Sequence, residues 1–115
     1  MVTRRQRQIS NLIQKELGDL LEKRVSDPRL AFVTITSVEV SPDLRHARVY
    51  VSTWGDQQEA IQGLNHAVSF IRRELASRLV LRNAPELTFH LDESLQRAER
   101  IFQLLEEQGL GKQIP

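Results

Sequence analysis

Arginine side chains are the residues of this chain whose number and placement point most directly to a chemistry. Thirteen of the 16 cationic residues are arginine, and a guanidinium group can bond a phosphate or carboxylate in two places at once. The net charge is only +1, but residues 1–25 and 67–85 each sum to +3, and the segments 26–66 and 86–115 sum to −2 and −3. If the fold joins the two basic segments, they make a patch of about +6 that attracts a phosphate backbone.

The two basic segments and one arginine between them supply the candidate RNA-binding residues, which are Arg4, Arg5, Arg7, Arg45, Arg72, Arg73, Arg78 and Arg82. Tyr50 and Trp54 are candidates for base stacking, although tyrosine is common in strands for structural reasons alone. The alternative interpretation is that the arginines only form solvated helix faces.

Residue patterns for catalysis and metal binding are missing from the sequence. It contains no cysteine, none of its serines lies in a G-x-S-x-G turn, and no Gly-rich phosphate loop is present. His46, His66 and His90 lack the close helical spacing that brings two ligands to one metal ion. We therefore expect a protein that is not an enzyme and that has no metal or cofactor.

The length and composition predict one small domain. The chain has 115 residues, 40% of them hydrophobic and 27% charged, which suits a single buried core. No apolar stretch approaches the ~18 residues of a membrane helix. These features predict a cytosolic protein.

Hydrophobic periodicity predicts the elements that must position the arginines. An apolar stripe with a Thr3 and Gln6 capping box predicts a helix over 4–25, ended by Asp27-Pro28. Alternating β-branched residues predict strands over 32–40 and 47–54, joined as a hairpin, with a bulge near Thr36-Ser37.

The second half of the chain predicts a long helix, a strand and a short helix. A stripe of apolar residues indicates one helix over about 57–82, and Phe70 lies half a turn away from that stripe, which favours a bend near residues 67–69. Residues 87–91 alternate as a third strand, and Asp92-Glu93-Ser94 caps a last helix. The predicted fold is α+β, a three-stranded sheet with helices on one face.

In these features the sequence resembles the ribosome-binding factor A family. The resemblance rests on three blocks, residues 26–30 (SDPRL), 33–44 with 47–52 (VTITSVEVSPDL, ARVYVS) and 70–75 with 79–89 (FIRREL, LVLRNAPELTF). The closing residues 92–95 (DESL) with Arg100-Ile101 are also similar. Together the blocks cover nearly the whole chain in the family's order.

The resemblance implies a single type II KH-like domain, which we place over residues 1–108. From the residues themselves, we expect 109–115 to form a flexible tail. It also implies a monomeric, non-catalytic factor that binds 16S rRNA of the immature small (30S) ribosomal subunit. Late maturation, including 5′-end processing by other enzymes, and contact with other assembly factors such as GTPases follow from it. The family's Ala-x-Gly interhelical kink matches Ala67-Val68-Ser69, where serine replaces the last glycine. The alternative is a protein-protein adaptor without direct RNA contact.

Overall fold

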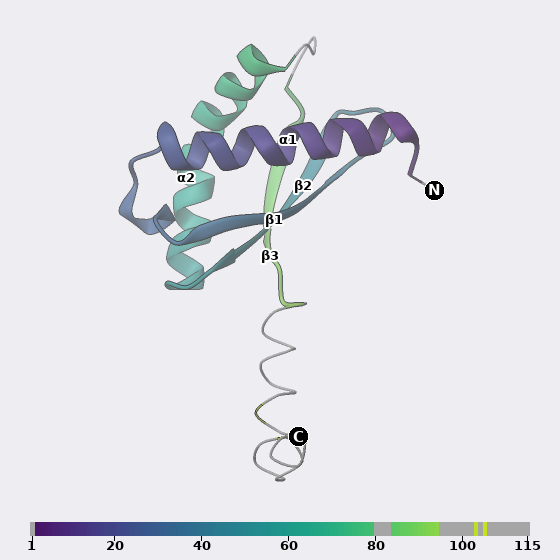
Figure 1. The fold of residues 1–115 in the computed structure, drawn as a ribbon. Coiled ribbons are helices and arrows are strands. Elements are labelled where there is room, and N and C mark those ends of the chain that lie inside the picture. Colours follow the sequence, from purple (N-terminus) through teal and green to yellow (C-terminus); the bar gives the residue numbers. More distant parts are fainter. Residues whose placement is uncertain (1, 80–83, 95–102, 104, 106–115) are drawn as a thin grey trace.

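The computed structural model of the chain describes residues 2–79, 84–94, 103 and 105. The helices and strands follow one another in the order α1, η1, β1, β2, α2 and β3 (Figure 1). Their bounds are Arg4–Lys23 for α1, Pro28–Leu30 for the 3-10 helix η1, Val33–Val40 for β1, His46–Thr53 for β2, Gln57–Arg78 for α2 and Glu86–Leu91 for β3. The predicted α+β class and the predicted order of these elements are confirmed.

The described strands form one sheet in the order β1-β2-β3. β1 pairs antiparallel with β2, and β3 joins β2 in parallel after the α2 crossover. The register shifts between Ile35 and Ser37, which confirms the predicted bulge. Ala47, Val49 and Val51 of β2 are buried, whereas the residues between them face outward, so both helices cover the same face of the sheet.

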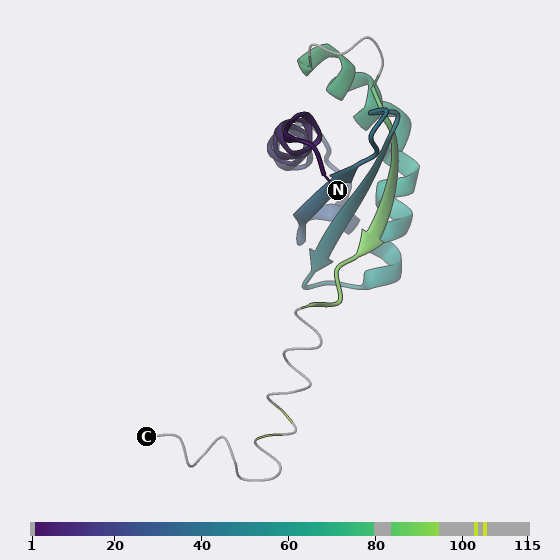
Figure 2. The same ribbon diagram turned by 90° about the vertical axis from the view of Figure 1, so that its right-hand side faces the viewer.

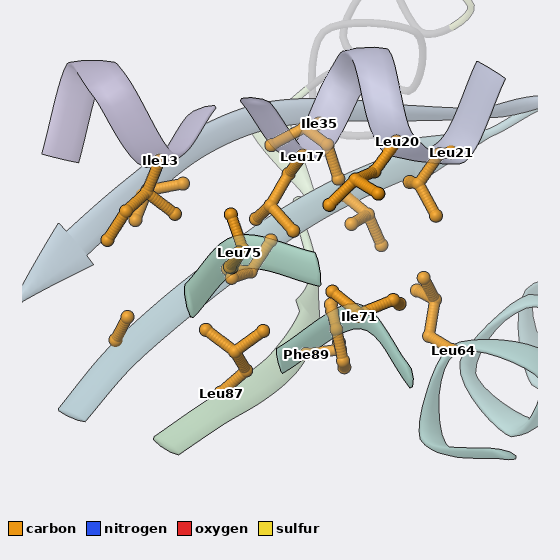
Figure 3. Close-up of a cluster of buried hydrophobic side chains, with 14 of the residues drawn as sticks. Ile13, Leu17, Leu20, Leu21, Ile35, Leu64, Ile71, Leu75, Leu87 and Phe89 are labelled. Carbon is orange, nitrogen blue, oxygen red and sulfur yellow. The ribbon is translucent and has the colours of Figure 1, made fainter. Parts of the chain in front are cut away.

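The core lies between this sheet face and the two helices (Figure 3). Ile13, Leu17 and Leu20 of α1 and Ile71 and Leu75 of α2 belong to this core, and all five side chains are fully buried. These residues belong to the apolar stripes that predicted the two helices. Burial of the stripes is therefore what orients both helices on the sheet.

Capping residues define the helix starts. Thr3 and Gln6 form the predicted capping box of α1, and the Asp56 side chain accepts a hydrogen bond from the Glu59 amide at the start of α2. α2 ends at Arg78 and not at residue 82, because Leu79 leaves the helical conformation and buries its side chain in the core. α1 ends at Lys23, two residues before the predicted boundary.

α2 is one continuous α-helix whose axis changes direction along its length (Figures 1 and 2). The prediction that Ala67, Val68 and Ser69 set this angle stays a prediction. The predicted C-terminal helix, the domain boundary at 108 and the tail over 109–115 lie outside the described residues, apart from isolated positions of that helix. Among the helices that the structure describes, none is long and apolar enough to cross a membrane.

We expect Leu17→Ala to lower the free energy of unfolding by about 2–5 kcal/mol, because it removes fully buried methyl groups and leaves a cavity. Leu12→Ala is the matched control, since Leu12 lies on the same helix and is 40% exposed. Its cost should stay within about 0.5 kcal/mol. Urea denaturation followed by circular dichroism measures both, and equal losses would contradict the packing described above.

Candidate nucleic-acid interface

Three segments that are distant in sequence meet at one end of the molecule: the start of α1, the β1–β2 turn and the start of β3 (Figure 1). The Gln6 side-chain amide donates to the Val40 carbonyl oxygen at 3.0 Å, which fixes the start of α1 beside the end of β1. The Glu86 amide donates to the Arg45 carbonyl oxygen at 2.8 Å, which joins the turn to β3. We call this region the basic end, because it carries Arg4, Arg5, Arg7 and Arg45.

The four arginines of the basic end are exposed. Their side chains make no hydrogen bond or ion pair with any other residue in the described part of the chain. The first turn of α1 contains no acidic residue, so the positive end of the helix dipole adds to their charge. The basic end can therefore receive phosphate groups.

Hydrogen bonds within the β1–β2 turn hold Arg45 in place. The Asp43 carboxylate accepts from the Ser41 hydroxyl at 2.7 Å and from the Arg45 amide at 3.0 Å. These two bonds lower the pKa of Asp43 below its usual value. Leu44, which adopts a positive φ of 62°, packs against the core. The turn is therefore held both by the hydrogen bonds of Asp43 and by the packing of Leu44.

Arg72 is directed to backbone acceptors within the protein. Its guanidinium donates to the Pro85 carbonyl oxygen at 3.1 Å and to the Ala84 carbonyl oxygen at 3.2 Å. These bonds connect α2 to the residues that lead into β3. The predicted phosphate contact of Arg72 is untested, and two of its donor groups already have internal partners.

Arg78 links the two helices. Its guanidinium donates to Glu16 at 3.1 Å and to Asp19 at 2.8 Å, and Lys23 also contacts Asp19 at 2.9 Å. The hydrogen bonds from Lys23 and Arg78 lower the pKa of Asp19. The predicted contact of Arg78 with phosphate would have to compete with two carboxylates.

The two basic segments do come together, but this contact reduces their exposed charge. Besides Arg78, the contact includes Arg24, which lies 3.5 Å from Glu74. Arg73 is exposed on α2, and its side chain makes no hydrogen bond or ion pair with another described residue, whereas Arg82 lies outside the described residues. The exposed charge is thus smaller than the patch of about +6 expected from the sequence.

The outer face of the sheet holds the aromatic candidate Tyr50. Its ring lies 5.6 Å from the His90 ring, centroid to centroid, on the neighbouring strand. Arg48 is exposed on the same face of β2, and sequence analysis did not single it out. The alternation of the strand could have pointed to Arg48, because Arg48 and Tyr50 are two residues apart and therefore face the same side of the sheet. Trp54 is 85% exposed just beyond β2.

Comparison with known proteins identifies the family. The sequence profile of ribosome-binding factor A matches residues 5–105. The chain belongs to the ribosome-binding factor A family. Ribosome-binding factor A of Dictyoglomus thermophilum is 46% identical over 110 residues, which cover 92% of either chain.

Solved structures of ribosome-binding factor A share the fold. The crystal structure from Thermus thermophilus has a TM-score of 0.74 and 25% identity, and the match covers 77% of this chain and 97% of that one. A Thermus thermophilus homology model, fitted into a cryo-EM map of a 30S complex of that factor, has a TM-score of 0.65 and 26% identity. That match covers 73% of this chain and 91% of the other.

Arg78 makes two ion pairs with α1 and is therefore expected to stabilise the fold. Arg73, which has no ion pair with another described residue, is not expected to do so. Arg78→Gln should lower the melting temperature, because Glu16 and Asp19 lose their shared partner. Arg73→Gln is the matched control on the same helix and should leave the melting temperature unchanged. Thermal unfolding at low and high salt measures both. A larger loss for Arg73→Gln would contradict the assignment.

The ion pair of Asp27 with Arg29 predicts a specific sensitivity to acid. Hydrogen bonds from the Arg29 side chain and amide lower the pKa of Asp27 from 3.8 to about 2. The carboxylate therefore contributes its full stabilisation above about pH 4 and loses it as the pH falls toward about 2. Asp27→Asn should make unfolding stability depend less steeply on pH within this window.

Urea titrations at successive pH values from about 5 down to about 2 cover both pKa values and test this prediction. Glu22→Gln is the control, because it removes an exposed carboxylate of α1 that has no hydrogen bond to another described residue. The assignment is wrong if both variants change the acid dependence of unfolding equally.

Proposed function

We propose that this chain is a non-catalytic assembly factor that binds 16S rRNA of the immature small (30S) ribosomal subunit through its basic end. The observation that carries the proposal is the exposed set of Arg4, Arg5 and Arg7 on the first two turns of α1, with Arg45 on the adjoining turn. Family membership supports the ribosomal target, and the Thermus thermophilus relative fitted into a 30S complex supports the small subunit.

Phosphate contacts explain how such a surface acts on folded RNA. Arginine forks bond the backbone in two places and fix the position of the protein without reading base sequence. A rigid basic end selects RNA by shape, because the hydrogen bonds of Gln6 and Glu86 hold its segments at fixed separations. Arg73 lies apart from this end on α2 and extends the RNA contact if the RNA follows the helix.

Promotion of maturation follows from binding energy and requires no catalysis by this chain. Among the described residues, no group of three histidine, aspartate or glutamate side chains could hold a metal ion. A factor that binds one rRNA conformation more tightly than another shifts the population toward it. We propose that it acts as a cytoplasmic monomer and that the conformation it favours is the one whose 5′ end other enzymes process.

Salt dependence tests the electrostatic contact. Four phosphate contacts predict that log affinity falls with log salt at a slope of about −3 to −4. Arg4→Gln with Arg5→Gln should reduce the magnitude of this slope by about 1.4–1.8. Lys23→Gln with Arg24→Gln removes the same charge from the other end of α1 and should leave the slope nearly unchanged. Binding to purified immature small subunits at several salt concentrations provides the measurement.

Two outcomes would overturn the RNA contact. Equal effects of the two double variants would show that only net charge matters. A slope near zero with binding retained would favour the protein-protein adaptor. In bacteria that lack their own ribosome-binding factor A, the Arg4 and Arg5 variant should leave small subunits with unprocessed 16S 5′ ends, and full processing would contradict the proposed role in maturation.

A further inference from the structure

A polar hollow of about 470 Å³ lies on the sheet next to the basic end. It crosses all three strands, because Glu39 of β1, Arg48 of β2 and Thr88 of β3 are successive partners in the sheet and all line it. Ser41 and His46 line its side toward the β1–β2 turn, which belongs to the basic end. The hollow therefore borders the basic end and has the size of a small-ligand site.

The outer face of the sheet, on which these side chains lie, is polar and aromatic. The aliphatic residues of the three strands point to the helices, so the outward-facing positions hold polar, charged or aromatic side chains. Glu39, Arg48, Thr88 and His90 are exposed, and thus no described segment covers the face there. The core of a protein interface is usually hydrophobic, which this face does not provide. It suits a polar, planar ligand better than a protein surface.

Glu39 and Arg48 carry opposite charges and stand directly opposite each other in the pairing of β1 with β2. Side chains in such positions are close enough for opposite charges to attract. Both are exposed, yet neither makes a hydrogen bond or ion pair with any residue that the structure describes. A carboxylate acceptor and a guanidinium donor are thus available side by side, and a ligand that has both donors and acceptors can use them together.

The residues on the side of the hollow toward the basic end are occupied by contacts within the protein. The Nδ1 atom of His46 lies 3.3 Å from the carboxylate of Glu86. The Ser41 hydroxyl accepts a hydrogen bond from the His46 amide at 3.1 Å. These contacts fix the wall of the hollow and leave the carboxylate and guanidinium of the preceding pair as the groups that face a ligand.

Two aromatic rings lie next to the hollow on the same face. Tyr50 follows Arg48 by two residues along β2, a rise of about 6.7 Å. The His90 ring lies 5.6 Å from the Tyr50 ring, centroid to centroid, and its Nε2 atom lies 3.0 Å from the Thr88 hydroxyl. Aromatic rings on a protein surface stack on nucleobases with little regard to base identity. A donor and acceptor pair beside such rings points to single-stranded RNA.

We propose that this hollow binds an unpaired guanine of RNA and that the next base of the same strand stacks on Tyr50 and His90. Guanine has two neighbouring donors, N1–H and N2–H, which match the two oxygens of the Glu39 carboxylate. Its O6 and N7 acceptors match the guanidinium of Arg48. Adenine, cytosine and uracil lack this combination, and a Watson–Crick pair would already use the N1–H and N2–H groups.

The guanine site adds base preference to a surface that otherwise contacts phosphates. Phosphate contacts position a protein on RNA but carry no information about sequence. The inference rests on the proposed rRNA binding, since the same RNA reaches the hollow from the basic end. It deepens that proposal, because an unpaired guanine beside the bound backbone becomes part of what the chain recognises.

The probes are fluorescent five-nucleotide oligouridines whose central nucleotide is guanosine or adenosine, and anisotropy follows their binding to the full chain. The guanine probe should bind about tenfold more tightly, because adenine lacks the paired donors. Inosine at the same position lacks the N2 amino group and should lose most of this advantage. Equal affinity for guanine and adenine, or no binding of the guanine probe at millimolar concentration, would overturn the proposal.

Glu39→Gln separates base recognition from general electrostatics. Loss of a negative charge favours binding of any RNA, whereas loss of the carboxylate should weaken the guanine probe about tenfold without weakening the adenine probe. Glu22→Gln is the matched control, since it removes an exposed carboxylate from α1 and should keep the guanine preference. Circular dichroism verifies that both variants fold. A full guanine preference in Glu39→Gln would contradict the proposed site.

Tyr50→Leu tests the stacking contact. It should weaken the guanine and adenine probes alike, by about fivefold or more, because stacking tolerates any base. Phe32→Leu is the control, since it removes an aromatic ring that is 63% exposed just before the start of β1, away from the hollow. Unchanged affinity in a folded Tyr50→Leu variant, or an equal loss in Phe32→Leu, would refute the proposed place of the second base.

The guanine site and the basic end can fail separately. If Arg4→Gln with Arg5→Gln reduces the salt slope for small subunits but the probes show no guanine preference, only the guanine site is refuted. If the guanine preference depends on Glu39 and the double variant has no effect on small subunits, only the basic end is refuted.

Discussion

The packing of α1 across the inner face of the sheet is the contact on which the rest of this structure depends. Ile13, Leu17 and Leu20 are fully buried there against strand and α2 side chains (Figure 3). The side-chain amides of Gln6 and Gln14 then fix the helix to carbonyl groups of β1. Apolar burial supplies most of the stability, and the two amide bonds set the position of the helix along the strand. The basic end and the contact with α2 both follow from that position.

Internal pairing decides which arginines remain available to a partner. Arg78 and Arg72 are held by carboxylates and carbonyl groups, so their charge stabilises the junction of α2 with its neighbours. Arg4, Arg5 and Arg45 have no such partners among the described residues. Exposed arginines without an internal acceptor are the better candidates for phosphate binding, because none of their donor groups must first leave a partner.

The charge along α1 is unevenly neutralised. The arginines of its first turns make no hydrogen bond or ion pair with another described residue, whereas Glu16 and Asp19 of its second half are paired with Arg78 and Lys23. A near-zero net charge thus coexists with one end of the helix at which the positive charge is not neutralised.

Local sequence patterns determined the helices, the hairpin with its bulge, the capping box of α1 and the single buried sheet face, because periodicity and capping act within a few residues. The motif blocks also determined the family. Only the tertiary structure decided that Arg78 meets Glu16 and Asp19, some 60 residues away in sequence. The end of α2 at Arg78 was likewise decided by the core, which takes up Leu79. Charge pairing and the end of a helix against the core depend on distances between elements, and a linear pattern carries no such distances.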